Sequence, residues 1–145
     1  GARPLKTPMA DPADIPSGFF ISTPTNNTIA AAPAIGIGPT GFGTVTQLTS
    51  KATGATLNAK AGVITMHNAA LAASAAIQFT LTNSAISGTD VVVANQGTGG
   101  TAGSYNAHCV DVGAGSAIFR VVNTSAGSLS EAVTINFVVI DTTAG

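Results

Sequence analysis

The sequence predicts an all-β protein, an antiparallel β-sandwich or jelly-roll preceded by an extended, proline-rich N-terminal arm. Three observations predict this fold class. All seven prolines fall within residues 1–43, the chain beyond them consists of short apolar segments separated by Gly, Ser and Asn, and no segment shows a convincing helical period. Regularly spaced short strands with turn residues between them are typical of sandwiches and barrels. We therefore divide the chain into an arm, residues 1–43, and a β-sandwich domain, residues 44–145.

The arm is expected to be extended because proline recurs along it. Proline fixes φ and lacks a backbone N–H, so this spacing excludes a regular helix and a central strand. The arm nevertheless contains apolar clusters at residues 19–21 and 29–37, which a solvated tail would not keep. We expect it to lie on another surface, that of a partner subunit, with the surface of its own domain as the alternative. The expected contact residues are Phe19, Phe20, Ile21, Ile29, Ile35 and Ile37.

Beyond the arm, the pattern changes to eight short segments that we predict to be strands. They are Thr44–Thr49, Thr56–Asn58, Gly62–His67, Ala75–Thr82, Asp90–Asn95, Ser104–Val112, Ser116–Asn123 and Ala132–Asp141. The clearest places Ile77, Phe79 and Leu81 on the inner face, with polar residues alternating between them. The alanine-rich residues 68–76 are predicted to be a loop, with a single helical turn as the alternative. Residues 113–115 are predicted to form a hairpin turn between two strands.

The last predicted strand shows the strongest alternation. Its inward-facing residues are Val133, Ile135, Phe137 and Val139. Thr134 and Asn136 face the opposite way, which is the pattern of a strand with one buried face. Residues 137–140 are apolar on both faces. A strand that is two-sided at its end is expected to run beneath a second layer, either another sheet or a neighbouring subunit.

Charged residues are scarce and make up 8% of the chain, against about 25% in ordinary soluble domains. No basic cluster is present for nucleic acid or anionic lipid. No apolar run approaches the roughly 18 to 20 residues that span a bilayer, so neither nucleic acid nor membrane is an expected partner. A surface built of Thr, Ser, Asn, Gly and Ala suits a protein packed against copies of itself or a partner.

The N-terminus and the cysteine content both bear on the compartment of synthesis. The first residues, Gly-Ala-Arg-Pro-Leu-Lys, have no apolar stretch behind their charges, so we expect no signal peptide. The single cysteine, Cys109, excludes an internal disulfide and favours synthesis in a reducing cytoplasm.

Two glycine-rich segments, Gly36–Gly41 and Gly97–Ala102, match a dinucleotide-binding fingerprint in their letters. That fingerprint binds a pyrophosphate when a strand precedes the glycines and a helix N-terminus follows them. The first segment lies in the proline arm, and the second leads into residues that alternate like a strand. We therefore predict turns at both places and no cofactor.

His108, Cys109 and Asp111 lie close together in the sequence and invite a metal or nucleophile hypothesis. Neighbours in a strand point to opposite faces, so His108 and Cys109 diverge, while Cys109 and Asp111 are expected to share a face. We expect Cys109 to be a small buried hydrophobe and His108 to be exposed or interfacial. His67 could meet His108 across a sheet, but two histidines make a weak metal site. Because no spaced Ser/His/Asp set falls on one face, the sequence predicts no enzyme and no catalytic, cofactor-binding or metal-binding residues.

Four segments together resemble a known family. They are Gly43–Gly54, Gly62–Leu71, Asp90–Val93 and Ser125–Ala132. Their amino-acid sequences resemble those of small structural proteins encoded among the virion genes of tailed bacteriophages and prophages. The resemblance covers residues 43–145 and includes no catalytic motif; the family usually has alternating apolar residues after a tyrosine, where this chain has Ala107 and Cys109. The arm lies outside the resemblance.

The resemblance implies a virion component, a capsid decoration or cement protein that stabilises the head from outside. Its expected partners are the major capsid protein and copies of itself, as a homotrimer, after synthesis in the bacterial cytoplasm. The alternative is a head-fibre or tail-tip module that binds a host receptor or glycan. Such a module needs exposed aromatic rings to stack on sugars. The chain has no Trp and a single Tyr, Tyr105, which we predict to point inward.

Overall fold

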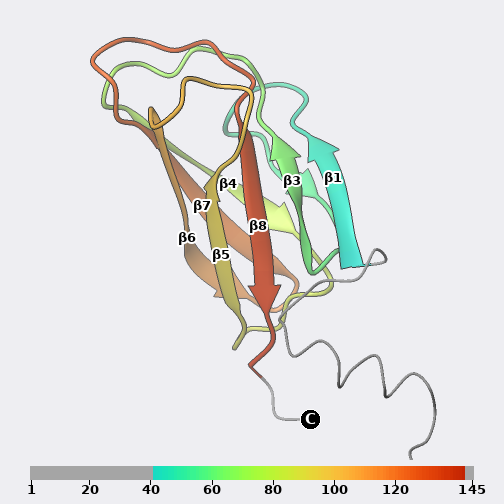
Figure 1. The fold of residues 1–145 in the computed structure, drawn as a ribbon. Coiled ribbons are helices and arrows are strands. Elements are labelled where there is room, and N and C mark those ends of the chain that lie inside the picture. The colour runs from blue at the N-terminus through green and yellow to red at the C-terminus, as the bar shows by residue number, and fades with distance from the viewer. Residues whose placement is uncertain (1–40, 143–145) are drawn as a thin grey trace, which may run out of the picture. The chain divides into compact units, whose positions relative to one another are not determined.

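The computed structural model describes residues 41–142, which form two four-stranded β-sheets and contain no α-helix (Figure 1). The strands are β1 (Phe42–Thr46), β2 (Ala55–Thr56), β3 (Ala61–Thr65), β4 (Ala76–Thr82), β5 (Val91–Gln96), β6 (Tyr105–Gly113), β7 (Ser116–Asn123) and β8 (Thr134–Ile140). All eight predicted strands are confirmed, and the bounds of β7 are as predicted. The expected N-terminal arm lies outside the described residues. Within residues 41–142 no helix is long and apolar enough to cross a membrane.

The strands of one sheet follow the order β1-β3-β8-β5 and those of the other the order β2-β4-β7-β6. We call them the β8 sheet and the β7 sheet. The pairs β3/β8, β5/β8, β4/β7 and β6/β7 are antiparallel, as predicted, but β1/β3 and β2/β4 are parallel. The parallel pairs arise because β1 to β4 alternate between the sheets, so that two successive crossings bring the chain back in its original direction.

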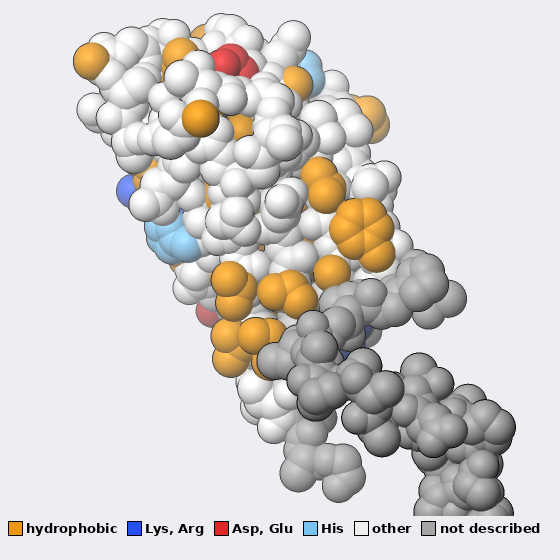
Figure 2. All heavy atoms as spheres, viewed as in Figure 1, with side chains coloured by type: hydrophobic (Ala, Val, Ile, Leu, Met, Phe, Trp, Pro, Cys, Tyr) orange, Lys and Arg blue, Asp and Glu red, His pale blue; other side chains and the backbone are white. Residues whose placement is uncertain are grey.

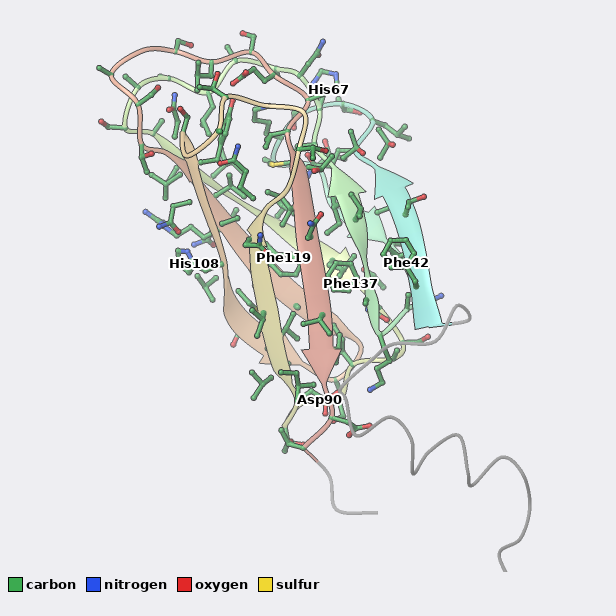
Figure 3. All side chains as sticks on the ribbon, viewed as in Figure 1. Phe42, His67, Asp90, His108, Phe119 and Phe137 are labelled. Carbon is green, nitrogen blue, oxygen red and sulfur yellow. The ribbon has the colours of Figure 1, made fainter. Side chains whose placement is uncertain are left out.

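The inner faces of the two sheets share one hydrophobic core, which makes the fold β-sandwich-like. Phe119 of β7 is fully buried, with its ring centroid 5.5 Å from that of Phe79 in the same sheet and 6.1 Å from that of Phe137 in the β8 sheet (Figure 3). The inward residues predicted for the last strand are all buried: Val133, Ile135, Phe137 and Val139. Burial of one such side chain is worth about 1.5–3 kcal/mol. The two sheets are therefore held together by the residues whose alternation is clearest in the sequence.

The β6–β7 hairpin turns at Ala114 and Gly115, as predicted, with Gly113 paired to Ser116. Gly115 has a φ of 82°, a backbone conformation that glycine adopts without steric cost. The alanine-rich residues 68–76 form no helix, in agreement with the predicted loop. This loop is held to the β7–β8 connection by a backbone pair between Leu71 and Leu129.

Strand β6 contains a bulge that the alternation did not reveal. Cys109 is in register with Phe119 and Asp111 with Ile118, so Val110 is the extra residue. A bulge shifts the alternation by one position, and Asp111 is exposed. The expectation that Cys109 and Asp111 share a face is therefore wrong.

Candidate interaction surface

The outer face of the β8 sheet carries large apolar side chains that remain exposed. Phe42, Val91, Val93 and Ile140 are 52%, 49%, 48% and 46% exposed. Val63 and Val138 lie on the same outer face and are half-buried. We call these six residues the apolar face.

The strand register makes the apolar face continuous. Phe42 of β1 is paired with Ala61 of β3, Ala61 with Val138 of β8, and Val138 with Val93 of β5. Because paired residues of adjacent strands point to the same side of a sheet, this row crosses the whole sheet. Beyond it, Val91 is paired with Ile140. Figure 2 shows the apolar side chains gathered over the part of the sheet where β1 and β5 begin and β8 ends.

Strands β5 and β8 are apolar on both sides where they meet. In β5, Val92 is buried in the core while its neighbours Val91 and Val93 are about half exposed. In β8, Val139 is buried while Ile140 is exposed. A strand that is apolar on both faces normally lies between two layers. The inner layer is the β7 sheet, and the half-exposed outer residues indicate a place for a further layer.

Charged groups border the apolar face at the start of β5. Lys60 Nζ lies 3.6 Å from Asp90 Oδ2 and 3.4 Å from Asp141 Oδ2. The Asp90 side chain is only 1% exposed and accepts hydrogen bonds from the backbone N–H and the hydroxyl of Ser87, at 2.9 and 2.8 Å. The Ser87 backbone N–H contributes most to lowering the pKa of Asp90, followed by the Ser87 hydroxyl, while burial opposes both. Asp90 therefore fixes the entry of β5 beside the apolar face.

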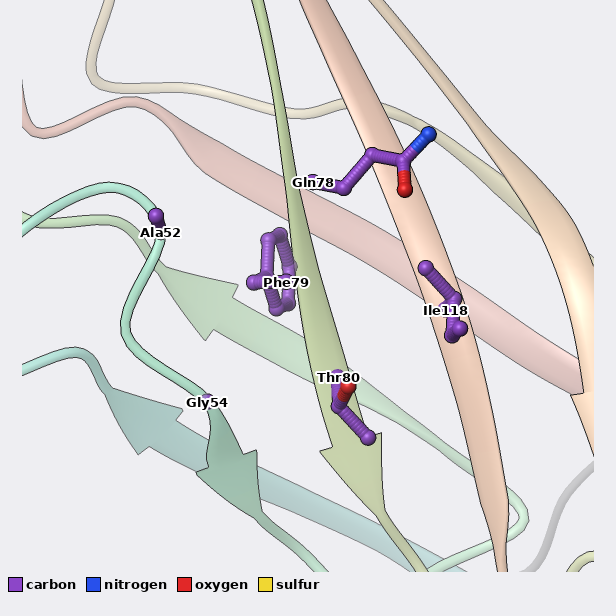
Figure 4. A pocket seen from close by; sticks show the side chains of 6 residues that line it. All are labelled: Ala52, Gly54, Gln78, Phe79, Thr80 and Ile118. Atoms are coloured by element: carbon purple, nitrogen blue, oxygen red, sulfur yellow. The ribbon is translucent and has the colours of Figure 1, made fainter.

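The outer face of the β7 sheet is mixed rather than apolar: Ile118 and Val122 are half-buried there and Val110 is 43% exposed, among polar residues. Gln78, Arg120 and His108 are in register across β4, β7 and β6. One hollow of about 220 Å³ lies beside β4 (Figure 4). Its lining residues are Ala52, Gly54, Gln78, Phe79, Thr80 and Ile118. The hollow is smaller than the roughly 300–1,000 Å³ of typical ligand pockets and is lined by no ionisable group, so it offers no chemistry.

The residues that suggested metal or nucleophile chemistry are not brought together. His67 follows β3 in one sheet and His108 lies in β6 of the other, and Figure 3 shows them far apart, so they do not meet across a sheet. His67 Nδ1 accepts a hydrogen bond from the backbone N–H of Ala69 at 3.0 Å. Within residues 41–142 no three His, Cys, Asp or Glu side chains are grouped to hold a metal ion. Cys109 was expected to be buried; it is half-buried and packs against the core, and burial raises the pKa of its thiol.

The glycine-rich segment 97–102 connects β5 to β6, so a strand follows it where a dinucleotide site requires a helix. This segment is a turn, as predicted. Of the other glycine-rich segment, only Gly41 is among the described residues.

A polar cluster around Lys51, at the end of the domain away from Asp90, was not predicted from the sequence. Lys51 is 3% exposed, and its ammonium donates to the backbone carbonyls of His67 and Glu131. The Glu131 carboxylate accepts hydrogen bonds from the hydroxyls of Tyr105, at 3.0 Å, and Thr101, at 2.9 Å. Burial lowers the pKa of Lys51, and the charge of Glu131 opposes that shift. These groups satisfy one another, which indicates a structural role.

The contact residues expected in the arm, Phe19, Phe20, Ile21, Ile29, Ile35 and Ile37, lie outside the described residues. The exposed large apolar residues that the sequence analysis did not single out are Phe42, Leu48, Val91, Val93 and Val110. Val91 and Val93 had a signal in the sequence, because alternation is lost in residues 91–93, and Ile140 belongs to residues 137–140, which were predicted to be apolar on both faces. Phe42 had no such signal. Comparison with protein-family models, with curated proteins and with solved structures finds no match to this chain.

Proposed function

We propose that the chain is a bacteriophage virion structural protein, a capsid decoration protein that stabilises the head from outside. In this proposal it binds the major capsid protein and copies of itself, as a homotrimer, and its arm lies in grooves between them. The β-domain, a sandwich or jelly-roll, supplies the rigid body, and the arm supplies the anchor. The apolar face is the observation that carries the proposal.

The apolar face supports a binding role because an isolated domain gains nothing from it. The fold is already supported by its inner core, so outward-facing Val and Ile at about half exposure are not needed to hold the sheets together. The largest contiguous apolar patch of a monomeric protein, on the order of a few hundred Å², is often a functional surface. Full burial of each such side chain against a partner would contribute about 1.5–3 kcal/mol. Repetition around a symmetric shell multiplies this contribution and opposes expansion of the head.

The rival role, a head-fibre or tail-tip module that binds glycan, fits the described residues less well. Phe42 is the one exposed aromatic side chain within residues 41–142, and it lies among aliphatic residues on the apolar face. Tyr105 is 5% exposed, so the predicted inward position is confirmed. Stacking on sugars uses aromatic rings together with polar groups in one site. Phe42 and the polar hollow beside β4 lie on different sheets.

The test compares binding to purified capsids with binding to host cells. We expect the full chain to co-sediment with capsids and to appear in electron-microscope images as density at fixed positions on the shell. A chain with Phe19, Phe20 and Ile21 changed to serine is expected to lose at least tenfold in capsid affinity, because each loses apolar burial. Binding to cells without binding to capsids would reject the decoration role. Undiminished capsid binding after deletion of residues 1–40 would reject the anchoring role of the arm.

A further inference from the structure

We infer that the apolar face is the docking surface for residues 19–37 of a second copy of this chain, so that adjacent copies are joined by exchange of their arms. The inference rests on the proposed function, which places copies side by side, and adds to it the surface that receives the arm. Three features support this occupant: the absence of charge from both the arm and the apolar face, the size of the face, and the point at which the chain enters β1.

The arm and the apolar face match in chemistry. From Ile15 to Ser50 the chain contains no charged residue, and within this stretch lie the apolar clusters at residues 19–21 and 29–37. The face is likewise formed by uncharged aliphatic and aromatic side chains. Neither surface would leave a charge unpaired when buried against the other, so both can be desolvated at low cost.

The size of the face favours a narrow occupant. Four exposed side chains and two half-buried ones present an apolar patch on the order of a few hundred Å². A stable interface between globular partners takes about 800 Å² from each side. The sheet is about 15–20 Å wide, and an extended segment of residues 19–37 spans about 60 Å. An extended segment can therefore cover the face completely, whereas a second sheet packed on it would contact mostly the polar residues around it.

The entry point of the chain favours a second copy as the source of the arm. Strand β1 begins at Phe42, which itself belongs to the apolar face. Pro33 and Pro39 flank Ile35 and Ile37, and proline favours extended backbone for itself and for the residue before it. A straight continuation from Phe42 leads off the end of the chain's own sheet. To cover its own face, the arm would need the turn predicted at Gly36–Gly41 to reverse the chain completely within a few residues of β1, whereas a second copy can receive the arm without such a reversal.

Crosslinking within the full-length protein tests the inference directly. A benzophenone amino acid is placed at position 93 on the apolar face, or as the control at position 110, where Val110 is 43% exposed on the edge strand β6 of the other sheet. An equal mixture of ¹⁴N- and ¹⁵N-labelled protein, co-assembled by unfolding and refolding, is irradiated, digested and sequenced by mass spectrometry. We expect position 93, and not position 110, to crosslink to residues 19–37, with about half of these crosslinks joining a light copy to a heavy one.

Point variants supply a second readout that needs no crosslinker. A hydroxyl buried without a partner is unfavourable, so Val93→Thr is expected to weaken self-association. The Kd of self-association, measured by analytical ultracentrifugation, is expected to rise about tenfold. The matched Val110→Thr change is expected to leave it within twofold. Phe19→Ser with Phe20→Ser is expected to weaken self-association and to remove the position-93 crosslink.

The possible outcomes separate this inference from the proposed function. Crosslinks confined to one copy, crosslinks from position 93 to the β8 sheet of another copy, or no crosslink above the position-110 control would each overturn arm exchange. Capsid binding is measured separately. A protein that exchanges arms but ignores capsids would reject decoration and leave arm exchange standing, whereas one that binds capsids without the crosslink would do the reverse.

Discussion

The outer faces of the two sheets differ although their inner faces share one core. The β8 sheet turns Val91, Val93 and Ile140 outward, whereas the β7 sheet turns Gln78 and Arg120 outward. Packing of the core constrains only the inward positions, so the outward positions are free to be polar, as Gln78, Thr80 and Arg120 are on the β7 sheet. Ile118 and Val122 also face outward there, but both are half-buried. The apolar outward positions of the β8 sheet are therefore better explained by a partner than by folding.

The largest effect on stability is expected at Phe119, in the core that the two sheets share. Phe119 contacts aromatic rings from both sheets, and its change to alanine is expected to lower the free energy of unfolding by about 3–5 kcal/mol. Urea denaturation measures this loss, with Val93→Ala on the apolar face as a control that changes it by less than about 1 kcal/mol. Hydrogen exchange should show faster exchange in both sheets. Loss of protection in only one sheet would show that the sheets do not depend on a common core.

The sequence was sufficient to predict the strands because their alternation reflects burial directly. β7 and β8 show this best, since the residues that alternate in the sequence are those that fill the core. The outer apolar positions were visible only indirectly, as runs in which alternation is lost. In residues 91–93, for example, periodicity alone does not show which of three valines points inward. That choice is made by the register with β8, which pairs Val92 with buried Val139.

Features that depend on long-range geometry could not be predicted. The bulge at Val110 depends on the pairing of β6 with β7, and the parallel pairs depend on crossings between sheets. Lys51 illustrates a further limit, because a lysine in a Ser- and Thr-rich turn is typical of a solvated loop. It can be buried because the backbone carbonyls of His67 and Glu131, which are distant in sequence, accept hydrogen bonds from its ammonium.

A charge placed on each face should sharpen the comparison. Ile140→Asp puts a carboxylate on the apolar face, and burying it against an apolar partner without a matching charge is expected to weaken self-association about a hundredfold, or about 2.7 kcal/mol. Thr80→Asp, on the outer face of the β7 sheet, is expected to leave self-association within twofold. Sedimentation velocity over a dilution series measures both. Equal losses in the two variants would mean that the outer faces do not differ in function.

Alkaline pH should lower the stability of the fold through ionisation of Tyr105, which lies in β6 of the β7 sheet. Burial, with the hydrogen bond to Glu131, raises the pKa of Tyr105 to about 12. In the unfolded chain the phenol titrates near 10, so its contribution is fully present below about pH 10 and is lost as the pH rises to about 12. The loss amounts to about 1–3 kcal/mol. Thermal unfolding from pH 8 to 12 measures it, and Tyr105→Phe, which cannot ionise, should show a weaker dependence in this range.

The smallest effect is expected in acid and should act through the β8 sheet, where Asp90 holds the start of β5. Because the pKa of Asp90 is lowered in the folded protein, its contribution is present above about pH 4 and is lost as the pH falls through the folded value. Protonation also weakens its pairing with Lys60, so β5 should lose protection from hydrogen exchange before β6 does. Asp90→Asn should remove this pH dependence while keeping the shape of the side chain. If β6 opened first in acid, Asp90 would not be the group that fixes the edge of the apolar face.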